Sequence, residues 1–309
     1  MMQQWRSRHI MLVAILLMES LAALAAFVHA SPACSNTCGD IAISYPFGTA
    51  KGCGNTVFQN YAKCSKGKFL LTTHTGRYEV LRIAYEPQIL IVKDKKLSTC
   101  GEMQRTSIGF GLQEGTPFTV QGPHIVLLAC TSSSSIVQTS PTSLCDANGA
   151  QICQDLYGYC PSITNLGLSM NSDIRSCCLL TSAAMREGSP PFQIDPSSYG
   201  CLSYTSIYRF GLGEDFSSDY RNPNIWSYGI PLHFEYDEAT YSPGCHICEA
   251  SHGSCAFDDN SNFICVCPSG LNVTTECPPG STSNKDTTRL SMMVSSIWML
   301  GILTNLAKL

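Results

Sequence analysis

The chain has 309 residues, 44% of them hydrophobic and 14% charged, with a formal net charge of −4 at pH 7. This overall charge gives no indication of a protein that binds nucleic acid, or another polyanion, through its surface as a whole. The 18 cysteines, an even number, favour an exported and oxidised protein over a cytosolic one.

The first 30 residues have the pattern of a secretory signal. Two arginines stand before an apolar stretch that begins at Ile10, and small residues close the segment at Ala30. We expect cleavage there and a mature chain that starts at Ser31. The alternative is an N-terminal membrane anchor, which Glu19 disfavours because it interrupts the apolar stretch.

The charges divide the mature chain into two parts. Residues 31–100 contain 9 lysines and arginines against 4 acidic residues, whereas residues 101–289 contain 7 against 18. The first part is therefore basic, and this asymmetry indicates a polyanionic partner for it. The alternative is that its lysines only keep strands soluble and protect sheet edges.

Short runs rich in Val, Ile, Leu, Thr and Tyr predict five β-strands, at 69–74, 77–85, 88–92, 117–120 and 124–129. Turns containing Gly or Pro separate the first three. Residues 132–143 predict a Ser/Thr-rich loop, and residues 181–187 predict one short helical turn. Because helical periodicity is weak in the rest of the mature chain, we expect an all-β, small disulfide-rich fold with little helix.

The cysteines all lie in the part of the chain that would be exported. They are Cys34, Cys38, Cys53, Cys64, Cys100, Cys130, Cys145, Cys153, Cys160, Cys177, Cys178, Cys201, Cys245, Cys248, Cys255, Cys265, Cys267 and Cys277. We predict that they form disulfides, although spacing does not reveal the connectivity. Adjacent cysteines rarely bond each other, so we expect Cys177 and Cys178 to tie this point to two distant places.

The C-terminal end combines small residues, a short polar spacer and an apolar run that reaches Leu306. This pattern resembles a glycosylphosphatidylinositol attachment signal, with Gly280 and Ser281 as candidate attachment residues. A transmembrane helix is the alternative, but it normally needs about 20 apolar residues. Asn272 begins an N-glycosylation sequon.

The two ends of the mature chain carry the most specific motifs. Residues 34–54 read CSNTCGDIAISYPFGTAKGCG, and residues 245–270 read CHICEASHGSCAFDDNSNFICVCPSG. The first stretch resembles the galacturonan-binding module of plant wall-associated receptor kinases. The second resembles the cysteine-rich, growth-factor-like module of the same ectodomains, and a looser similarity runs through the middle of the chain.

The resemblance implies a galacturonan-binding-like module over 31–100, a β-rich disulfide-bonded middle region over 101–241 and a growth-factor-like module over 242–277. A polar spacer and anchor signal would follow over 278–309. Unlike the receptors, the chain has no glycine-rich nucleotide loop and no kinase catalytic motif. We therefore expect a kinase-less protein, membrane-anchored at the outer face of the plasma membrane or in the cell wall, with a receptor kinase ectodomain as a further partner.

The stretch Tyr45-Pro46-Phe47-Gly48 lies between two cysteines. Pro46 fixes φ and Gly48 permits a sharp turn, so the two rings are firmly placed. Either the rings fill a small core, or one is exposed as a stacking platform for a sugar ring. We expect the core position for Phe47, and both alternatives stay open for Tyr45.

A galacturonan presents a carboxylate on each sugar, so the resemblance implies cationic ligand-binding residues. The candidates are Tyr45, Lys51, Lys63, Lys66, Lys68, Arg77 and Arg82. Lys66 and Lys68 have the spacing of residues on one face of a strand. Because one exposed ion pair contributes about 1 kcal/mol or less, we expect binding to need several pairs and to weaken with salt. The alternative function is a structural or protein-interaction module that binds a protein ligand or a receptor ectodomain.

Other chemistry finds less support in the sequence. Cys245, His246, Cys248 and His252 have the residue types of a zinc site, but an exported chain this rich in cysteine favours disulfides. Asp258 and its neighbours lack the alternating oxygen ligands of calcium loops. No nucleophile signature such as G-x-S-x-G is present, so we expect no enzyme activity, no metal and no cofactor.

Overall fold

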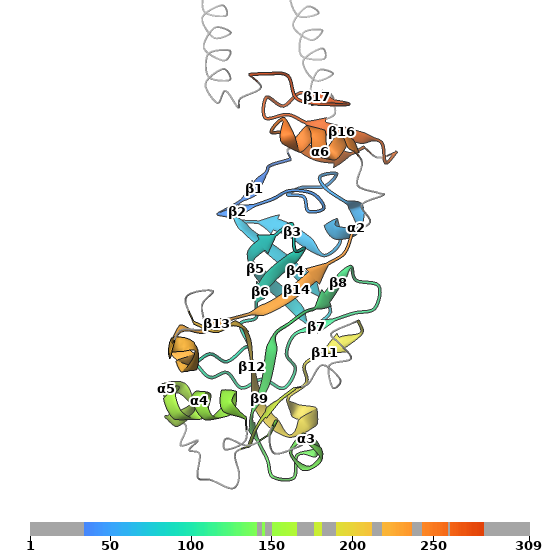
Figure 1. Cartoon of the computed structure of the whole chain (residues 1–309). Helices are drawn as coiled ribbons and strands as arrows, with labels where there is room; N and C mark the ends of the chain where they lie inside the picture. The colour runs from blue at the N-terminus through green and yellow to red at the C-terminus, as the bar shows by residue number, and fades with distance from the viewer. Residues whose placement is uncertain are drawn as a thin grey trace, which may run out of the picture.

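The computed structural model describes residues 34–140, 144–145, 150–165, 176–180, 190–211, 218–236, 243–258 and 260–280. These residues form an elongated body (Figure 1). A cysteine-rich C-terminal module lies at one end, a six-stranded sheet in the middle, and a four-stranded sheet with its helices at the other end. The first described residues lie between the C-terminal module and the six-stranded sheet.

The six-stranded sheet is antiparallel throughout and has the order β3-β4-β5-β6-β14-β8. Its strands are β3 (Ala62–Ser65), β4 (Lys68–Thr73), β5 (Gly76–Ala84), β6 (Ile89–Lys93), β14 (Ile230–Phe234) and β8 (Phe118–Val120). The predicted 31–100 module thus supplies four of the six strands, and later segments complete the sheet.

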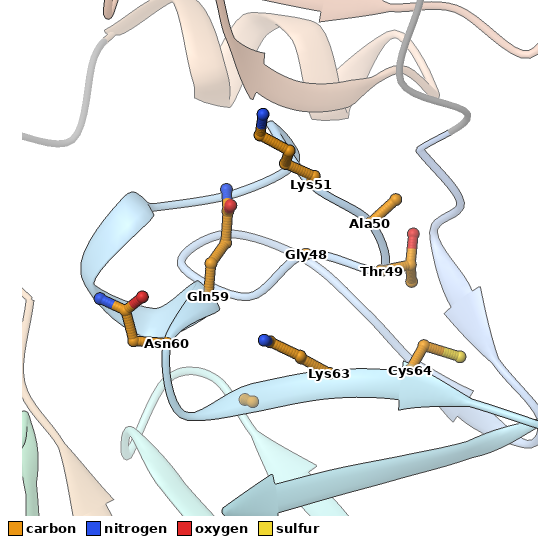
Figure 2. Close-up of a pocket in the computed structure, with 9 residues that line it drawn as sticks. Gly48, Thr49, Ala50, Lys51, Gln59, Asn60, Lys63 and Cys64 are labelled. Carbon is orange, nitrogen blue, oxygen red and sulfur yellow. The ribbon is translucent and has the colours of Figure 1, made fainter. Parts of the chain in front are cut away.

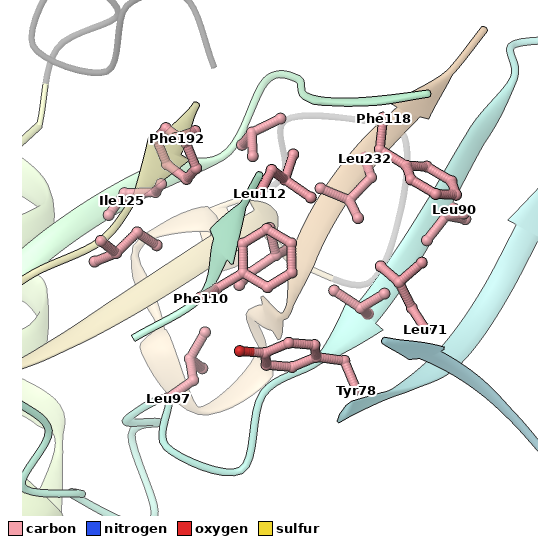
Figure 3. Packing of buried hydrophobic residues seen from close by; sticks show 14 of the residues in the cluster. Leu71, Tyr78, Leu90, Leu97, Phe110, Leu112, Phe118, Ile125, Phe192 and Leu232 are labelled. Carbon is pink, nitrogen blue, oxygen red and sulfur yellow. The ribbon is translucent and has the colours of Figure 1, made fainter. Parts of the chain in front are cut away.

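Side chains alternate between the two faces of this sheet because successive residues of a strand point in opposite directions. The inner face packs Leu71, Leu90, Phe118 and Leu232 into the main hydrophobic core (Figure 3). The outer face carries the polar members of the same strands. The runs of Val, Ile, Leu, Thr and Tyr that predicted these strands supply the buried residues of the inner face.

The four-stranded sheet continues the core. Its order is β10 (Ser176–Leu179), β9 (His124–Cys130), β12 (Cys201–Arg209) and β13 (Ser227–Tyr228). Ile125 of β9 joins the main core, whereas Val126 faces a second cluster with Leu156 of helix α4 (Gln151–Tyr159). The central strand β9 is therefore buried on both sides, which agrees with its continuous apolar run.

The remaining elements are short. In the first half they are β1 (Thr37–Cys38), β2 (Ile41–Ala42), α2 (Thr56–Gln59), β7 (Gly111–Leu112) and α3 (Ser135–Thr139). Later come α5 (Pro161–Thr164), β11 (Phe192–Gln193) and the 3₁₀ turns η2 (Ser197–Tyr199), η3 (Ser218–Arg221) and η4 (Pro223–Ile225). The C-terminal module consists of α6 (Pro243–Ala250), β15 (Ser254–Phe257), β16 (Phe263–Val266) and β17 (Asn272–Val273).

All 18 cysteines form disulfides, as predicted. The pairs are Cys34–Cys53, Cys38–Cys64, Cys100–Cys160, Cys130–Cys201, Cys145–Cys178, Cys153–Cys177, Cys245–Cys255, Cys248–Cys265 and Cys267–Cys277. The adjacent Cys177 and Cys178 bond to different partners, which confirms the prediction made for them. The preference for disulfides over a zinc site at Cys245 and Cys248 is confirmed as well.

The all-β, disulfide-rich fold class is confirmed, and each of the five predicted strands lies within two residues of its predicted ends. Helices α2 to α6 were not predicted from the sequence. Helix α3 lies inside the predicted loop 132–143. Helix α4 buries Cys153, Leu156 and Tyr157, which have helical spacing. The sequence prediction missed this helix because it is only nine residues long and one of its buried residues is a cysteine.

Several predictions lie outside the described residues: the signal at 1–30, the helical turn at 181–187, and the C-terminal anchor beyond Gly280, including Ser281. Asn272 is exposed at the start of β17. Within the described ranges no helix has the length and apolar character needed to cross a bilayer.

Candidate functional site

The Tyr45-Pro46-Phe47 stretch sends its two rings into different clusters. Phe47 is 3% exposed in the main core, where its ring packs edge-on against Phe58, Phe69 and Phe234 at centroid distances of 4.9–5.6 Å. The predicted core position of Phe47 is confirmed. The short stretch therefore anchors the N-terminal segment to the inner face of the sheet.

Tyr45 is only 4% exposed, so the alternative of an open stacking platform was wrong for this residue. Its ring packs against Tyr236 and lies in a cluster with the disulfide of Cys245 and Cys255 from the C-terminal module. Its hydroxyl accepts a hydrogen bond from the Asn55 side chain at 2.9 Å. Tyr45 is a contact between two modules rather than a surface for a ligand.

Two glycines let the chain pass close to itself at this point. Gly54 has φ +69°, and a Cβ there would lie 2.4 Å from the carbonyl oxygen of Phe47. A Cβ on Gly48 would lie 1.9 Å from the carbonyl oxygen of Cys53. Both positions need glycine because no side chain has room there, so the loop between them is held against the Phe47 turn.

The outer face of strands β3 to β6 is basic. The strand register places Lys63, Leu70, Glu79 and Lys93 in one row across four strands. Arg77 lies two residues from Glu79 on the same face and pairs with Thr72. We call the cations of this surface, Lys63, Lys68, Arg77, Arg82 and Lys93, the basic face.

One of these cations is neutralised in the structure. The Lys68 ammonium lies 2.8 Å from the Glu79 carboxylate. Glu79 is the one acidic residue within strands β3, β4, β5 and β6. Among the described residues, Lys63, Arg77, Arg82 and Lys93 have no carboxylate within 4.0 Å. The basic face therefore keeps a net positive charge after its internal ion pair is counted.

The strand pairing corrects part of the sequence prediction. Lys66 does not share a strand face with Lys68, because it lies in the turn between β3 and β4 with φ 51°. Arg77 and Arg82 both lie within β5, on its exposed side. A bulge between Val80 and Arg82 shifts the register and keeps Arg82 on the exposed side.

A pocket of about 500 Å³ opens beside strand β3 (Figure 2). Its walls are the loop residues 48–51, Gln59 and Asn60 at the end of α2, and residues 62–64 of β3. Lys51 and Lys63 are both exposed and line the pocket from different walls, and in Figure 2 the Lys51 side chain points away from Lys63, toward the C-terminal module. Because Lys63 also belongs to the basic face, the pocket and that face form a continuous cationic surface.

The polar side chains of the pocket have different tasks. The Gln59 side-chain amide bonds to the neighbouring loop: it donates to the carbonyl of Cys53 at 2.8 Å and accepts from the backbone amide of Gly52 at 3.3 Å. Lys51 has no carboxylate partner among the described residues. The pocket therefore carries two exposed lysines without a carboxylate partner among the described residues.

Sequence reasoning missed Lys93 as a candidate site residue. It was counted among the basic residues of the first part, but nothing local marked it as a neighbour of Lys63. Only the pairing of β5 with β6 places Lys93 opposite Glu79, in the same row as Lys63. Only the register of the β5–β6 hairpin could have found it, because Ile89 and Ile91, the other residues on that side of β6, are apolar.

Residues 34–94 match the family model described as wall-associated receptor kinase galacturonan-binding. This segment is a domain of that family. Comparison with curated proteins and with solved structures gave no match. The wall-associated domain, residues 34–94, contains strands β1 to β6, the pocket walls and all seven candidate ligand residues.

Proposed function

We propose that this chain is an extracellular binding protein, not an enzyme, that recognises acidic pectin through its wall-associated domain. The observation that carries the proposal is the continuous cationic surface of this domain, formed by the basic face and the pocket beside β3. The family match adds support, because its description names galacturonan binding.

The geometry fits a linear polymer of uronic acids. Neighbouring strands are about 4.8 Å apart, so Lys63 and Lys93, at the two ends of a row across four strands, can face different carboxylates of one extended chain. The cations Lys63, Arg77 and Lys93 are exposed and have no carboxylate within 4.0 Å among the described residues. Each contact is worth about 1 kcal/mol or less, and affinity then comes from several contacts made by one chain.

The proposal is tested with the purified protein and polygalacturonate. We expect binding at low ionic strength, a steep loss of affinity as salt increases, and no binding to a neutral galactan of similar length. Equal binding to both polymers, or affinity that does not change with salt, would contradict the proposal. Binding of a receptor ectodomain without any binding of pectin would support the protein-interaction alternative instead.

The location follows from the same domain. Its wall-associated family indicates a protein outside the cell. We propose further that the protein is tethered by lipid at Gly280 or Ser281 and carries a glycan on Asn272. Release from intact cells by a phosphatidylinositol-specific phospholipase is the expected result, with a mass shift on deglycosylation that Asn272→Gln abolishes. Retention on the cells after the phospholipase treatment would contradict the lipid anchor.

A receptor kinase is the proposed signalling partner, since the chain has no kinase motif of its own. Co-precipitation from cell surfaces under mild detergent should recover a kinase. Recovery of none, with the pectin-binding activity intact, would leave the protein as a wall-binding module without this partner.

A further inference from the structure

The C-terminal module contacts the wall-associated domain at the loop that forms one wall of the pocket. Strand β15 lies along this loop as a short antiparallel bridge, in which Ala256 pairs with Cys53. The Gly54 amide donates to the carbonyl of Cys255 at 2.8 Å, and the Phe257 amide donates to the carbonyl of Gly52 at 2.8 Å. These two hydrogen bonds involve Gly52 and Gly54, so the C-terminal module is bonded to the loop directly after Lys51.

A second contact lies a few residues upstream. The Glu249 carboxylate of α6 accepts a hydrogen bond from the Tyr45 amide at 2.7 Å. The Tyr45 ring is buried against the Cys245–Cys255 disulfide. Burial raises the pKa of Glu249, while the Tyr45 amide and nearby His246 oppose that rise. Burying a carboxylate costs free energy that a solvated position would avoid. We therefore assign Glu249 a structural role in the contact between the two modules.

Lys51 lies at the tip of a tight turn between these contacts. The Cys53 amide donates to the carbonyl of Ala50 at 3.1 Å and closes the turn. Figure 2 shows the Lys51 turn directly beside the ribbon of the C-terminal module. On the other side, the turn is held by Gln59 and by the Cys34–Cys53 disulfide. The turn is thus held from two sides, one of which is supplied by residues some 200 positions further along the chain.

We propose that the C-terminal module is a clamp that sets the position of the Lys51 wall of the pocket, with Glu249 and β15 as its positioning elements. The inference rests on the proposed function, in which the polymer contacts the cations of the basic face and of the pocket, Lys51 included. None of the described residues of the module lines the pocket. It acts through the loop, so its removal alters the distance between two cations and not the cations themselves.

A single substitution can open the clamp and leave the module folded. The Phe257 amide donates to the carbonyl of Gly52 and therefore points away from β16. Phe257 and its partner Phe263 thus form a non-hydrogen-bonded pair of the antiparallel ladder. Phe257→Pro therefore removes the bond to Gly52 without breaking the β15–β16 ladder. Phe257→Ala is the matched control, because it also loses the ring but keeps the amide.

Amide hydrogen exchange reports the clamp directly. In the purified protein we expect the Gly54 amide, which bonds to Cys255, to exchange at least about tenfold faster in Phe257→Pro than in Phe257→Ala. We expect the affinity for polygalacturonate to fall at least about threefold in the same comparison. Unchanged exchange would show that no clamp exists. Faster exchange with unchanged affinity would show that the clamp does not position the pocket.

A second pair of variants covers the case in which Phe257→Pro fails to fold. Glu249→Ala removes the acceptor of the Tyr45 amide, and Glu276→Ala removes an exposed carboxylate of the same module as its control. Faster exchange of the Tyr45 amide and weaker binding are expected only for Glu249→Ala. Equal behaviour of the two variants would overturn the proposal. If the unmodified protein binds no polygalacturonate, the proposed function fails, whereas the exchange measurements still decide whether the clamp exists.

Discussion

The two faces of the six-stranded sheet are formed by alternate residues of the same strands, but the two sets of side chains differ in burial and charge. The inner face is apolar and tightly packed around Phe47, while the outer face of β3 to β6 carries cations with one ion pair among them. Neighbouring residues such as Tyr78 and Arg77 belong to different faces. Stability therefore depends on the inner set of positions and the proposed pectin binding on the outer set, so the two can be altered separately.

The largest effect is expected at the inner face. Phe47→Ala removes a fully packed ring from the centre of an aromatic cluster and should lower the free energy of unfolding by about 3–5 kcal/mol. Denaturant unfolding under conditions that keep the disulfides intact measures this. A loss below about 1 kcal/mol would mean that the core does not depend on the Phe47 ring.

A smaller loss of stability is expected from the loop behind that ring. Gly54→Ala places a Cβ on a backbone with φ +69°, too close to the Phe47 carbonyl to fit without a shift of the chain. We expect a destabilisation of about 1–3 kcal/mol. Gly270→Ala is the control, since Gly270 also has positive φ but no atom within 4 Å of its added Cβ. Equal losses at the two glycines would show that the close approach is unimportant.

A substitution on the outer face should lower the affinity for polygalacturonate and leave the stability of the fold nearly unchanged. The single variant Lys93→Glu replaces one attraction by a repulsion of similar size, and each is worth about 1 kcal/mol or less. We expect a severalfold loss of affinity for polygalacturonate and a melting temperature close to that of the unmodified protein. A normal affinity with a lowered melting temperature would assign Lys93 to the fold and not to the ligand.

The smallest expected effect is a dependence on pH. Burial raises the pKa of Glu249 above its ordinary value in the folded protein. The stabilisation that its protonated form gives to the module contact is therefore complete below the ordinary pKa and is lost as pH rises through the raised one. Tyr45, His246 and Tyr85 are the neighbouring groups, and burial raises the pKa of Tyr85 further from the range of interest.

We therefore expect the Tyr45 amide to exchange faster, after correction for the intrinsic pH dependence, as the pH increases from about 4.5 toward neutrality. In Glu249→Gln this additional dependence should vanish, since the amide side chain does not titrate. The same dependence in both proteins would assign the effect to another group.

The sequence allowed the strands and the basic character of the wall-associated domain to be predicted, because both are local. Runs rich in Val, Ile, Leu, Thr and Tyr mark the strands, and the lysines are visible in the composition of residues 31–100. The turn at Lys66 was harder to predict, since Lys66-Gly67 falls between two strands whose ends depend on pairing. The ion pair between Lys68 and Glu79 also needs the register of β4 with β5.

The role of Tyr45 was beyond local prediction for a different reason. Its burial depends on Glu249 and on the C-terminal disulfides, which are about 200 residues away along the chain. No pattern near Tyr45 shows that a second module packs on it. For the same reason the pocket was not predicted: its two lysines were candidates, but only the fold brings Lys51 and Lys63 to the same pocket.

The most direct test of the account compares two double variants with the same change in net charge. Lys63→Glu/Lys93→Glu reverses two cations of the basic face, and Arg105→Glu/Arg209→Glu reverses two exposed cations outside the wall-associated domain. The measurement is the affinity for polygalacturonate at low ionic strength, with melting temperatures recorded in parallel. The account predicts at least about a tenfold loss for the first variant, a change of less than about twofold for the second, and similar melting temperatures for both. Equal losses of affinity in the two variants would contradict a localised binding face.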